Sequence, residues 1–392
     1  MDRGFHRYYG LISGAMNYFD ITQSKRRGLE RVFARDAERV TPAKKEFYAT
    51  DAFTDEALTM LRAHPADRPF FLYLAFNAPH WPLHAPPETI RKYENRYADG
   101  WSVLRRQRYQ RMRQMGVVRD SWKLSPADGE DWDRLSDVQR QDLARRMAVY
   151  AAMVDRMDWN IGRLVASLRE AGQLDNTLIL FLSDNGGCHE GGPRGGDMRP
   201  DLKGLTGAVD SYRTYGRSWS NVSNTPFRRH KHWAHEGGIA TPLIAHWPAR
   251  RRTAPGALTD EVGHVIDILP TLCAASGAAY PSQFAGEMIR PHEGRSLLPV
   301  FAGKRLGQPR TLFWEHMGNA AMRRGRWKLV RAARSSWELY DLVADRSEID
   351  DLADSHPARL ERMQADWQTW AVRVGARPQK SSGVKRRSNT DS

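Results

Sequence analysis

The sequence is poor in cysteine and in long apolar runs, and both shortages exclude classes of protein. Cys188 and Cys273 are the only cysteines among 392 residues. They lie far apart in unlike contexts, so neither a disulfide framework nor a cysteine-rich zinc site is expected. No stretch approaches the roughly 18 uninterrupted apolar residues that predict a membrane-spanning helix. The first residues, MDRGFHRYYG, lack the apolar core of a signal peptide, so no membrane partner is expected.

Positive charge is abundant, and its placement limits what it can mean. The net charge of +14 favours anionic partners in general. Part of it lies in residues 380–392, KSSGVKRRSNTDS, which show no apolar periodicity and are predicted to be disordered. Another part is the arginine cluster of LRRQRYQRMR, residues 104–113. No nucleic-acid-reading motif accompanies this cluster, so we interpret it as a solvated helix face and expect no nucleic-acid partner.

Three short apolar runs bounded by turn residues predict strands of a buried sheet. They are RPFFLYLAFNAPH (68–80), TLILFLSDNGG (177–187) and TPLIAHWP (241–248). Strands that alternate with helices predict an α/β fold with a mostly parallel sheet flanked by helices. Ligands of such sheets bind at the carboxyl ends of the strands. His80 and the pair Asp184–Asn185 stand at two of these ends.

One long helix is predicted between the first two strands. Ser136 and Gln139 have the spacing of a capping box, and Gly172 supplies a stop signal. Apolar residues recur between them in steps of four and three, which predicts a single stripe facing the sheet. The stripe comprises Leu143, Met147, Tyr150, Val154, Met157, Ile161, Leu164 and Leu168.

The pattern changes after about residue 290. TLFWEH, AMRRGRWKLV and WELYDL read as short strands, and a helix is predicted from Ser355 through Trp370. We therefore expect an α/β domain over 1–290, a small C-terminal domain with an antiparallel sheet and a helix over 291–379, and the tail 380–392. Residues 186–220 are glycine-rich and predict a long loop over a functional face.

The polar residues at the strand ends permit more than one interpretation. Asp184 and Asn185 offer oxygen ligands, which suit Ca2+ or Mg2+ better than zinc. Two ligands are too few for a site, and this motif alone favours an Asp-Asn-Gly turn that caps the strand. His230, His232 and His235 lack the spacing of a known zinc motif and are expected to be loop residues. Taken singly, Lys231 reads as a surface lysine and His80 as a histidine that ends a strand.

Taken together and in order, the motifs resemble the sulfatase family of the arylsulfatase type, with its alkaline-phosphatase-like fold. The resemblance covers nearly the whole chain and implies hydrolysis of sulfate esters, with a sulfated small molecule or a sulfated glycan as substrate. It implies that Asp184 and Asn185 complete a Ca2+ site, with Mg2+ the less favoured ion. It also implies that Lys231 contacts the sulfate group and that His80 lies at the sulfate and the leaving-group oxygen. The matching stretches are RGFHRYYGLISGAMNYF, RPFFLYLAFNAPHWPLHAPPE, YAAMVDRMDWNIGRLVASLREAGQLDNTLILFLSDNGG, NTPFRRHKHWAHEGGIATPLIAHWP, HVIDILPTL, RRGRWKLV and WELYDL.

The chain departs from the family pattern at the nucleophile. Sulfatases carry a C-x-P-S-R or S-x-P-S-R motif whose Cys or Ser is oxidised to formylglycine, and neither Cys188 nor Cys273 stands in such a motif. Ser355, Pro357 and Arg359 match the spacing, but Ser355 is expected to cap a helix instead. We therefore expect the formylglycine segment to be absent, the incomplete sheet to make the chain poorly stable, and the chain not to turn over alone.

Two alternatives to a sulfatase stay open at this stage. One is a noncatalytic protein of the sulfatase fold that binds sulfated anions, and the other is a related phosphodiesterase or phosphonate hydrolase. For a full-length sulfatase the resemblance suggests a periplasmic or secreted location, although this sequence shows no signal peptide. The sequence itself leaves the location open.

Overall fold

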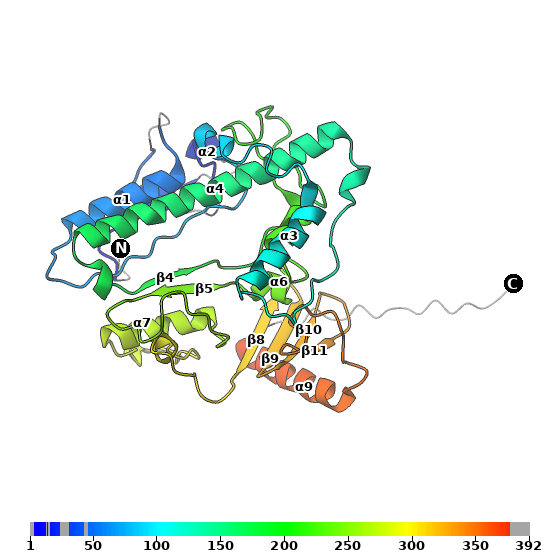
Figure 1. Cartoon of the computed structure of the whole chain (residues 1–392). Coiled ribbons are helices and arrows are strands. Elements are labelled where there is room, and N and C mark those ends of the chain that lie inside the picture. Colours follow the sequence, from blue (N-terminus) through cyan, green and yellow to red (C-terminus); the bar gives the residue numbers. More distant parts are fainter. Residues whose placement is uncertain (1–3, 13, 15, 24–30, 43–45, 377–392) are drawn as a thin grey trace.

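The computed structural model describes residues 4–376 except 13, 15, 24–30 and 43–45. The tail predicted over 380–392 lies outside the described residues. Figure 1 shows a larger part built around two long helices and a C-terminal part built on a sheet. The α/β class is confirmed, as is the small C-terminal antiparallel sheet with its helix. None of the helices in the described ranges is both long and apolar enough to cross a bilayer.

The long helix α4 (Asp137–Glu170) confirms the prediction made from its local signals. The Ser136 hydroxyl accepts a bond from the Gln139 amide, and the Gln139 side chain accepts one from the Ser136 amide at 3.0 Å. Gly172 follows the helix with φ of +69°, which glycine adopts without strain. Leu143 and Leu168 of the predicted stripe are buried, whereas Val154 is exposed.

Helix α4 runs beside α1 (Ala49–Ala63), as Figure 1 shows, and an ion pair joins the two helices. Arg156 of α4 contacts Asp51 of α1 at 2.6 Å. Near the N-terminal end of α4, Trp219 of α5 (Gly216–Ser223) is fully buried and donates to the backbone oxygen of Leu143 at 2.9 Å. Helix α4 therefore connects α1 and α5 within the larger part.

The strands of the larger part pair differently from the prediction. β4 (Ile179–Leu182) and β5 (Leu243–His246) are antiparallel and exposed along much of their length, so they are not the doubly buried parallel strands expected. The run 68–80 is assigned no strand, although its side chains alternate: Phe71 and Tyr73 are 60% and 74% exposed, and their neighbours are half-buried. An apolar run predicts extended backbone, but the choice of a hydrogen-bonded neighbour depends on distant segments.

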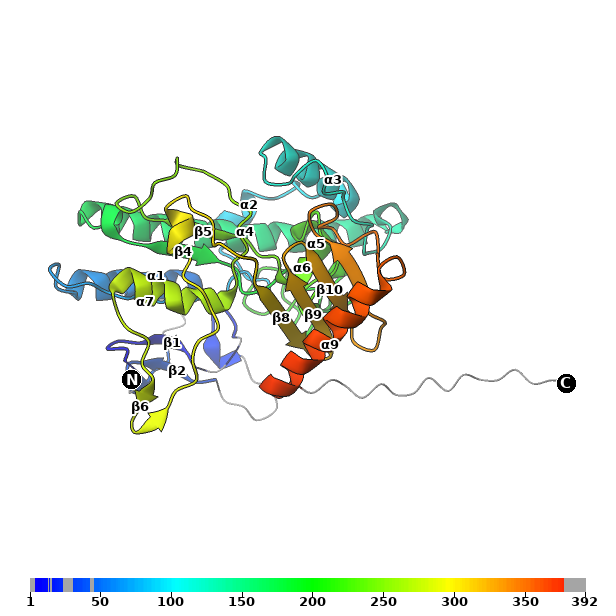
Figure 2. The same cartoon turned by 90° about the horizontal axis from the view of Figure 1, so that it is seen from below.

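The C-terminal sheet has four strands in the order β11-β10-β9-β8, all antiparallel. The stretch AMRRGRWKLV, expected to be one strand, is a hairpin that turns at Gly325, whose φ is +58°. Helix α9 covers one face, as Figure 2 shows. It begins at Pro357 with His356 as N-cap, so the prediction that Ser355 caps it was wrong. The bounds are β8 Thr311–His316, β9 Asn319–Arg324, β10 Trp327–Arg331, β11 Glu338–Asp341 and α9 Pro357–Val374.

The remaining elements are short, apart from α3, which carries the arginine cluster. Arg105 of that helix is buried and donates to the backbone oxygen of Ser125 at 2.7 Å, so the interpretation as a wholly solvated face was wrong there. These elements are β1 Tyr9–Leu11, β2 Phe33–Arg35, β3 Glu38–Arg39, α2 Pro87–Arg91, α3 Gly100–Gln114, α6 Glu236–Ile239, α7 Ile268–Ser276, β6 Gln283–Phe284, β7 Glu287–Met288 and α8 Leu298–Phe301.

Side chains alternate across the C-terminal sheet, and the two faces differ in chemistry. Met322 and Leu329 pack against Trp367 of α9 in an apolar layer. On the opposite face, Lys328 is fully buried and lies 2.7 Å from Glu236 and 2.8 Å from Glu348.

Arg346 contacts the other oxygen of Glu236 at 3.0 Å, and we call Lys328, Glu236, Glu348 and Arg346 the Lys328 cluster. Because charges are costly to bury unless they are paired, the cluster fixes α6 against the sheet.

We predict that Lys328→Met lowers the free energy of unfolding by about 3–5 kcal/mol, because it leaves two carboxylates buried without their shared cation. Urea denaturation of the purified chain measures the change. The matched control is Lys123→Met, since Lys123 pairs with Asp350 in an exposed ion pair and should contribute less than about 1 kcal/mol. An unchanged stability in Lys328→Met would contradict the account.

The second prediction concerns pH. Burial raises the pKa of Glu338, but His235, Tyr340 and Arg228 lower it more, to about 2. In the unfolded chain a glutamate titrates near about 4.3. The folded pKa is the lower one, so the stabilising contribution is complete above about pH 5 and is lost as the pH falls toward 2.

Urea denaturation between pH 6 and 3 should therefore show a smaller loss of stability in Glu338→Gln than in the unmodified chain. The difference in slope should be at most about 1.4 kcal/mol per pH unit, the limit for one proton. Glu94→Gln, which changes an exposed carboxylate, serves as control. Parallel slopes for all three proteins would show that Glu338 does not carry this stability.

Candidate active site

His80 and Lys231, 151 residues apart in sequence, meet side chain to side chain. The ammonium of Lys231 lies 3.0 Å from Nε2 of His80. Nδ1 of His80 lies 2.7 Å from the backbone oxygen of Trp81. Because a carbonyl oxygen only accepts, Nδ1 carries the proton and Nε2 presents a lone pair to Lys231. The structure thus brings together the two residues that the resemblance implies lie at one sulfate group.

The loop after β4 holds the Lys231 segment by backbone bonds. The Lys231 amide donates to the Gly187 oxygen at 3.0 Å, and the Gly186 amide donates to the Gly238 oxygen at 3.0 Å. A Cβ atom at Gly186 would lie 1.8 Å from the Gly237 oxygen, so this close approach requires glycine. The two glycines of SDNGG therefore allow the loop after β4 to lie directly against the Lys231 segment.

The C-terminal sheet holds the same segment from the other side. Glu338 of β11 pairs with Arg228 at 3.2 Å and with His235 at 3.3 Å. Glu236, the next residue, joins the Lys328 cluster. Lys231 is thus carried by a segment that charged contacts fix before and after it.

Glu190 belongs to the site although sequence reasoning missed it. One of its oxygens lies 3.4 Å from Lys231 Nζ and 3.5 Å from His232 Nε2, and the other accepts from Trp81 Nε1 at 2.5 Å. Burial raises the pKa of Glu190, but Trp81 and Lys231 lower it more, so the carboxylate is ionised at neutral pH. The available signal was an acidic residue inside the glycine-rich loop that follows a strand end.

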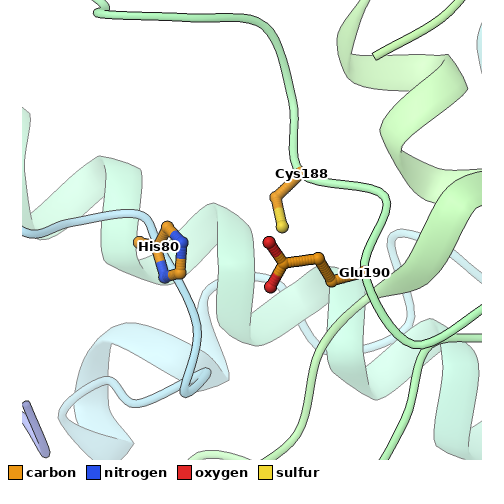
Figure 3. A group of neighbouring side chains, drawn as sticks. All are labelled: His80, Cys188 and Glu190. Carbon is orange, nitrogen blue, oxygen red and sulfur yellow. The ribbon is translucent and has the colours of Figure 1, made fainter. Parts of the chain in front are cut away.

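Cys188 stands beside these groups. Figure 3 shows Cys188, Glu190 and His80 turned toward one another, and one potential ligand atom from each lies within 4.8 Å of the other two. Burial raises the pKa of the Cys188 thiol to about 11, so the thiol is protonated at neutral pH. Sequence reasoning had set this cysteine aside because it lacks the nucleophile motif.

Asp184 and Asn185 lie at the end of β4, immediately before the glycines that contact the Lys231 segment. Asp184 is exposed, and Asn185 donates through its side-chain nitrogen to the Gly186 oxygen at 2.9 Å. Their oxygens suit a hard cation, but Ca2+ takes six to eight ligands. Over the described ranges, no group of three or more His, Cys, Asp or Glu includes Asp184. These two residues alone therefore supply fewer ligands than a Ca2+ ion takes.

The three histidines near Lys231 contact different partners. His230 is fully buried between Asp128, at 3.0 Å, and Ser220, at 2.8 Å. His232 faces Glu190 and His235 faces Glu338, as described above. They do not converge on one point, which agrees with their expected role as loop residues.

Comparison with known proteins identifies the family of this chain. The family profile described as Sulfatase matches residues 2–278, and one described as N-sulphoglucosamine sulphohydrolase, C-terminal, matches 228–367. A sulfatase of Schizosaccharomyces pombe is 32% identical over 95% of this chain and 71% of its own length, and an arylsulfatase of Klebsiella aerogenes is 31% identical over 77% and 67%. The crystal structure of Ps i-CgsB superposes with a TM-score of 0.64 at 25% identity, covering 97% of this chain and 68% of that one. The chain belongs to the sulfatase family.

Proposed function

We propose that this chain binds the sulfate group of a sulfate ester between Lys231 and His80 and contributes both side chains to hydrolysis of the ester. The contact of 3.0 Å between Lys231 Nζ and His80 Nε2 carries the proposal. It sets a lysine side chain beside an imidazole, a residue type that serves in general acid–base catalysis. Membership of the sulfatase family supports the choice of sulfate esters as the substrate class.

The two side chains match the charge changes of the reaction. Hydrolysis of a sulfate ester builds negative charge on the nonbridging oxygens and on the leaving oxygen. The Lys231 ammonium can hold a nonbridging oxygen, and His80, once protonated at Nε2, can deliver a proton to the leaving alcohol.

Glu190 also contacts the Lys231 ammonium. Its contact with Lys231 is 3.4 Å, longer than a good charge-assisted hydrogen bond. A sulfate oxygen can therefore replace Glu190 as the hydrogen-bond acceptor of the Lys231 ammonium. Trp81 holds Glu190 in place through the indole N–H.

We propose Asp184 and Asn185 as ligands of a Ca2+ ion, with Mg2+ as the less favoured ion. Carboxylate and amide oxygens are the donors such ions prefer. When bound, the ion would supply further positive charge for the sulfate oxygens. No residue of the described chain is proposed as nucleophile, because Cys188 and Cys273 lack the formylglycine motif and Ser355 bonds to the Leu352 oxygen beside α9.

The substrate proposed is a sulfated small molecule or a sulfated glycan. The name of the Klebsiella aerogenes relative, arylsulfatase, favours an aryl sulfate as the first compound to test. A periplasmic or secreted location for a full-length form remains a prediction.

We predict that Lys231→Met weakens binding of inorganic sulfate by about 10- to 100-fold, because a hydrogen bond to a charged group contributes about 1.5–3 kcal/mol. Isothermal titration calorimetry on the chain at low ionic strength measures the affinity. Lys203→Met is the matched control, since Lys203 is exposed and bonds to the Pro200 oxygen.

Equal sulfate affinity in Lys231→Met and the unmodified chain would refute the proposed site. As a second readout, the chain is joined to the nucleophile segment of a family member and assayed on an aryl sulfate. In that protein, Lys231→Ala and His80→Ala should abolish hydrolysis while Ser355→Ala retains it. Inactivation by Ser355→Ala would identify Ser355 as part of the chemistry instead.

A further inference from the structure

We propose that His80, Cys188 and Glu190 form a binding site for a transition-metal ion of the Zn2+ type, separate from the proposed calcium ligands. Their nitrogen, sulfur and oxygen ligand atoms lie within 4.8 Å of one another, as Figure 3 shows. Imidazole, thiolate and carboxylate together are zinc ligands, whereas Ca2+ takes oxygen ligands only. All three residues are half-buried.

The second layer of contacts is the kind that metal ligands need. Histidines that bind metals usually donate their other ring N–H to a carbonyl oxygen, and metal-binding carboxylates accept hydrogen bonds. Trp81 supplies both contacts, because its backbone oxygen accepts from Nδ1 of His80 at 2.7 Å and its indole donates to Glu190 at 2.5 Å. Nε2 of His80 and the second Glu190 oxygen are thereby held ready for a shared cation.

A cation already lies between these two atoms. Lys231 Nζ is 3.0 Å from Nε2 of His80 and 3.4 Å from the second oxygen of Glu190. Tetrahedral zinc at bond lengths of about 2.0–2.3 Å places its ligand atoms about 3.3–3.7 Å apart. The three ligand atoms therefore need to approach one another by at most about 1.5 Å, and the flexible lysine side chain must leave.

The binding step is a ligand exchange without oxidation or reduction. The Cys188 S–H bond breaks, its proton passes to water or buffer, and a sulfur–metal bond forms. His80 contributes its lone pair at Nε2, Glu190 contributes a carboxylate oxygen, and a water molecule completes the four-coordinate ion. Lys231 moves into solvent.

Metal and sulfate ester would then exclude each other. The metal ion takes the Nε2 atom of His80 and displaces Lys231, the two groups assigned to the sulfate. This consequence, which rests on the proposed function, makes the site an inhibitory one. The binding of metal itself does not depend on that function.

Cobalt(II) is the probe, because a bound thiolate gives Co2+ an intense near-ultraviolet charge-transfer band that oxygen and nitrogen ligands do not give. Titrating the intact chain, without added calcium, should produce this band and saturate at one equivalent. Cys188→Ser should abolish it, and Cys273→Ser, the matched control, should retain it. Added Zn2+ should bleach the band by replacing Co2+.

One further variant tests the carboxylate ligand. Glu190→Gln should retain the band but weaken Co2+ binding by at least about 10-fold, and circular dichroism should confirm that each variant is folded. A band that survives in Cys188→Ser, or that is lost in Cys273→Ser, would overturn the proposal. So would the absence of a band in the unmodified chain.

Competition with inorganic sulfate distinguishes the metal site from the proposed function. If both are correct, saturating sulfate raises the apparent dissociation constant of Co2+. A thiolate band with no sulfate binding would support the metal site and refute the sulfate site. Sulfate binding with no thiolate band would support the sulfate site and refute the metal site.

Discussion

The ion pairs of Lys328 with Glu236 and Glu348 are the contact on which the position of the active site depends. All three side chains are withdrawn from water, at 0%, 3% and 0% side-chain exposure. Charges in such a place are tolerated only in the geometry that pairs them, because separation would leave each one buried alone. The cluster therefore holds α6 in a fixed position against the C-terminal sheet.

Only a short stretch of chain separates the Lys328 cluster from Lys231 of the candidate active site. Glu236 lies five residues after Lys231, and Arg228 and His235 fix the same segment to Glu338. The Lys231 amide then bonds to the loop after β4. Three stretches distant in sequence thus meet at one ammonium group: the His80 turn, the loop from β4 to Glu190, and the Lys231 segment.

Local signals were enough to predict the elements whose causes are local. The capping box at Ser136 and the stop at Gly172 defined α4 to within a residue, and the short C-terminal strands with their helix were anticipated. The antiparallel pairing of β4 with β5, the unpaired run 68–80 and the hairpin at Gly325 depend on which segments lie side by side. That information is absent from the periodicity of any single run.

The residues of the candidate site also differ in whether the sequence could predict them. His80 and Lys231 were found through a resemblance that spans nearly the whole chain, and the structure places them in contact. Glu190 and Trp81 act through tertiary contacts that no local pattern records. Lys328 was even harder to foresee, because lysine is almost never fully buried and it sits in a strand that reads as ordinary.

Hydrogen exchange of the Lys231 amide is the most direct test of the central claim, that the Lys328 cluster holds Lys231 beside His80. In the unmodified chain this amide, bonded to the Gly187 oxygen, should be protected. The variant Lys328→Met is measured under conditions where the chain stays folded. Protection of the backbone amides should fall over residues 227–238, whereas the amides of α4 between Leu143 and Leu168 should keep their protection. Unchanged protection at Lys231, or an equal loss in α4, would show that the cluster contributes general stability and does not position the site.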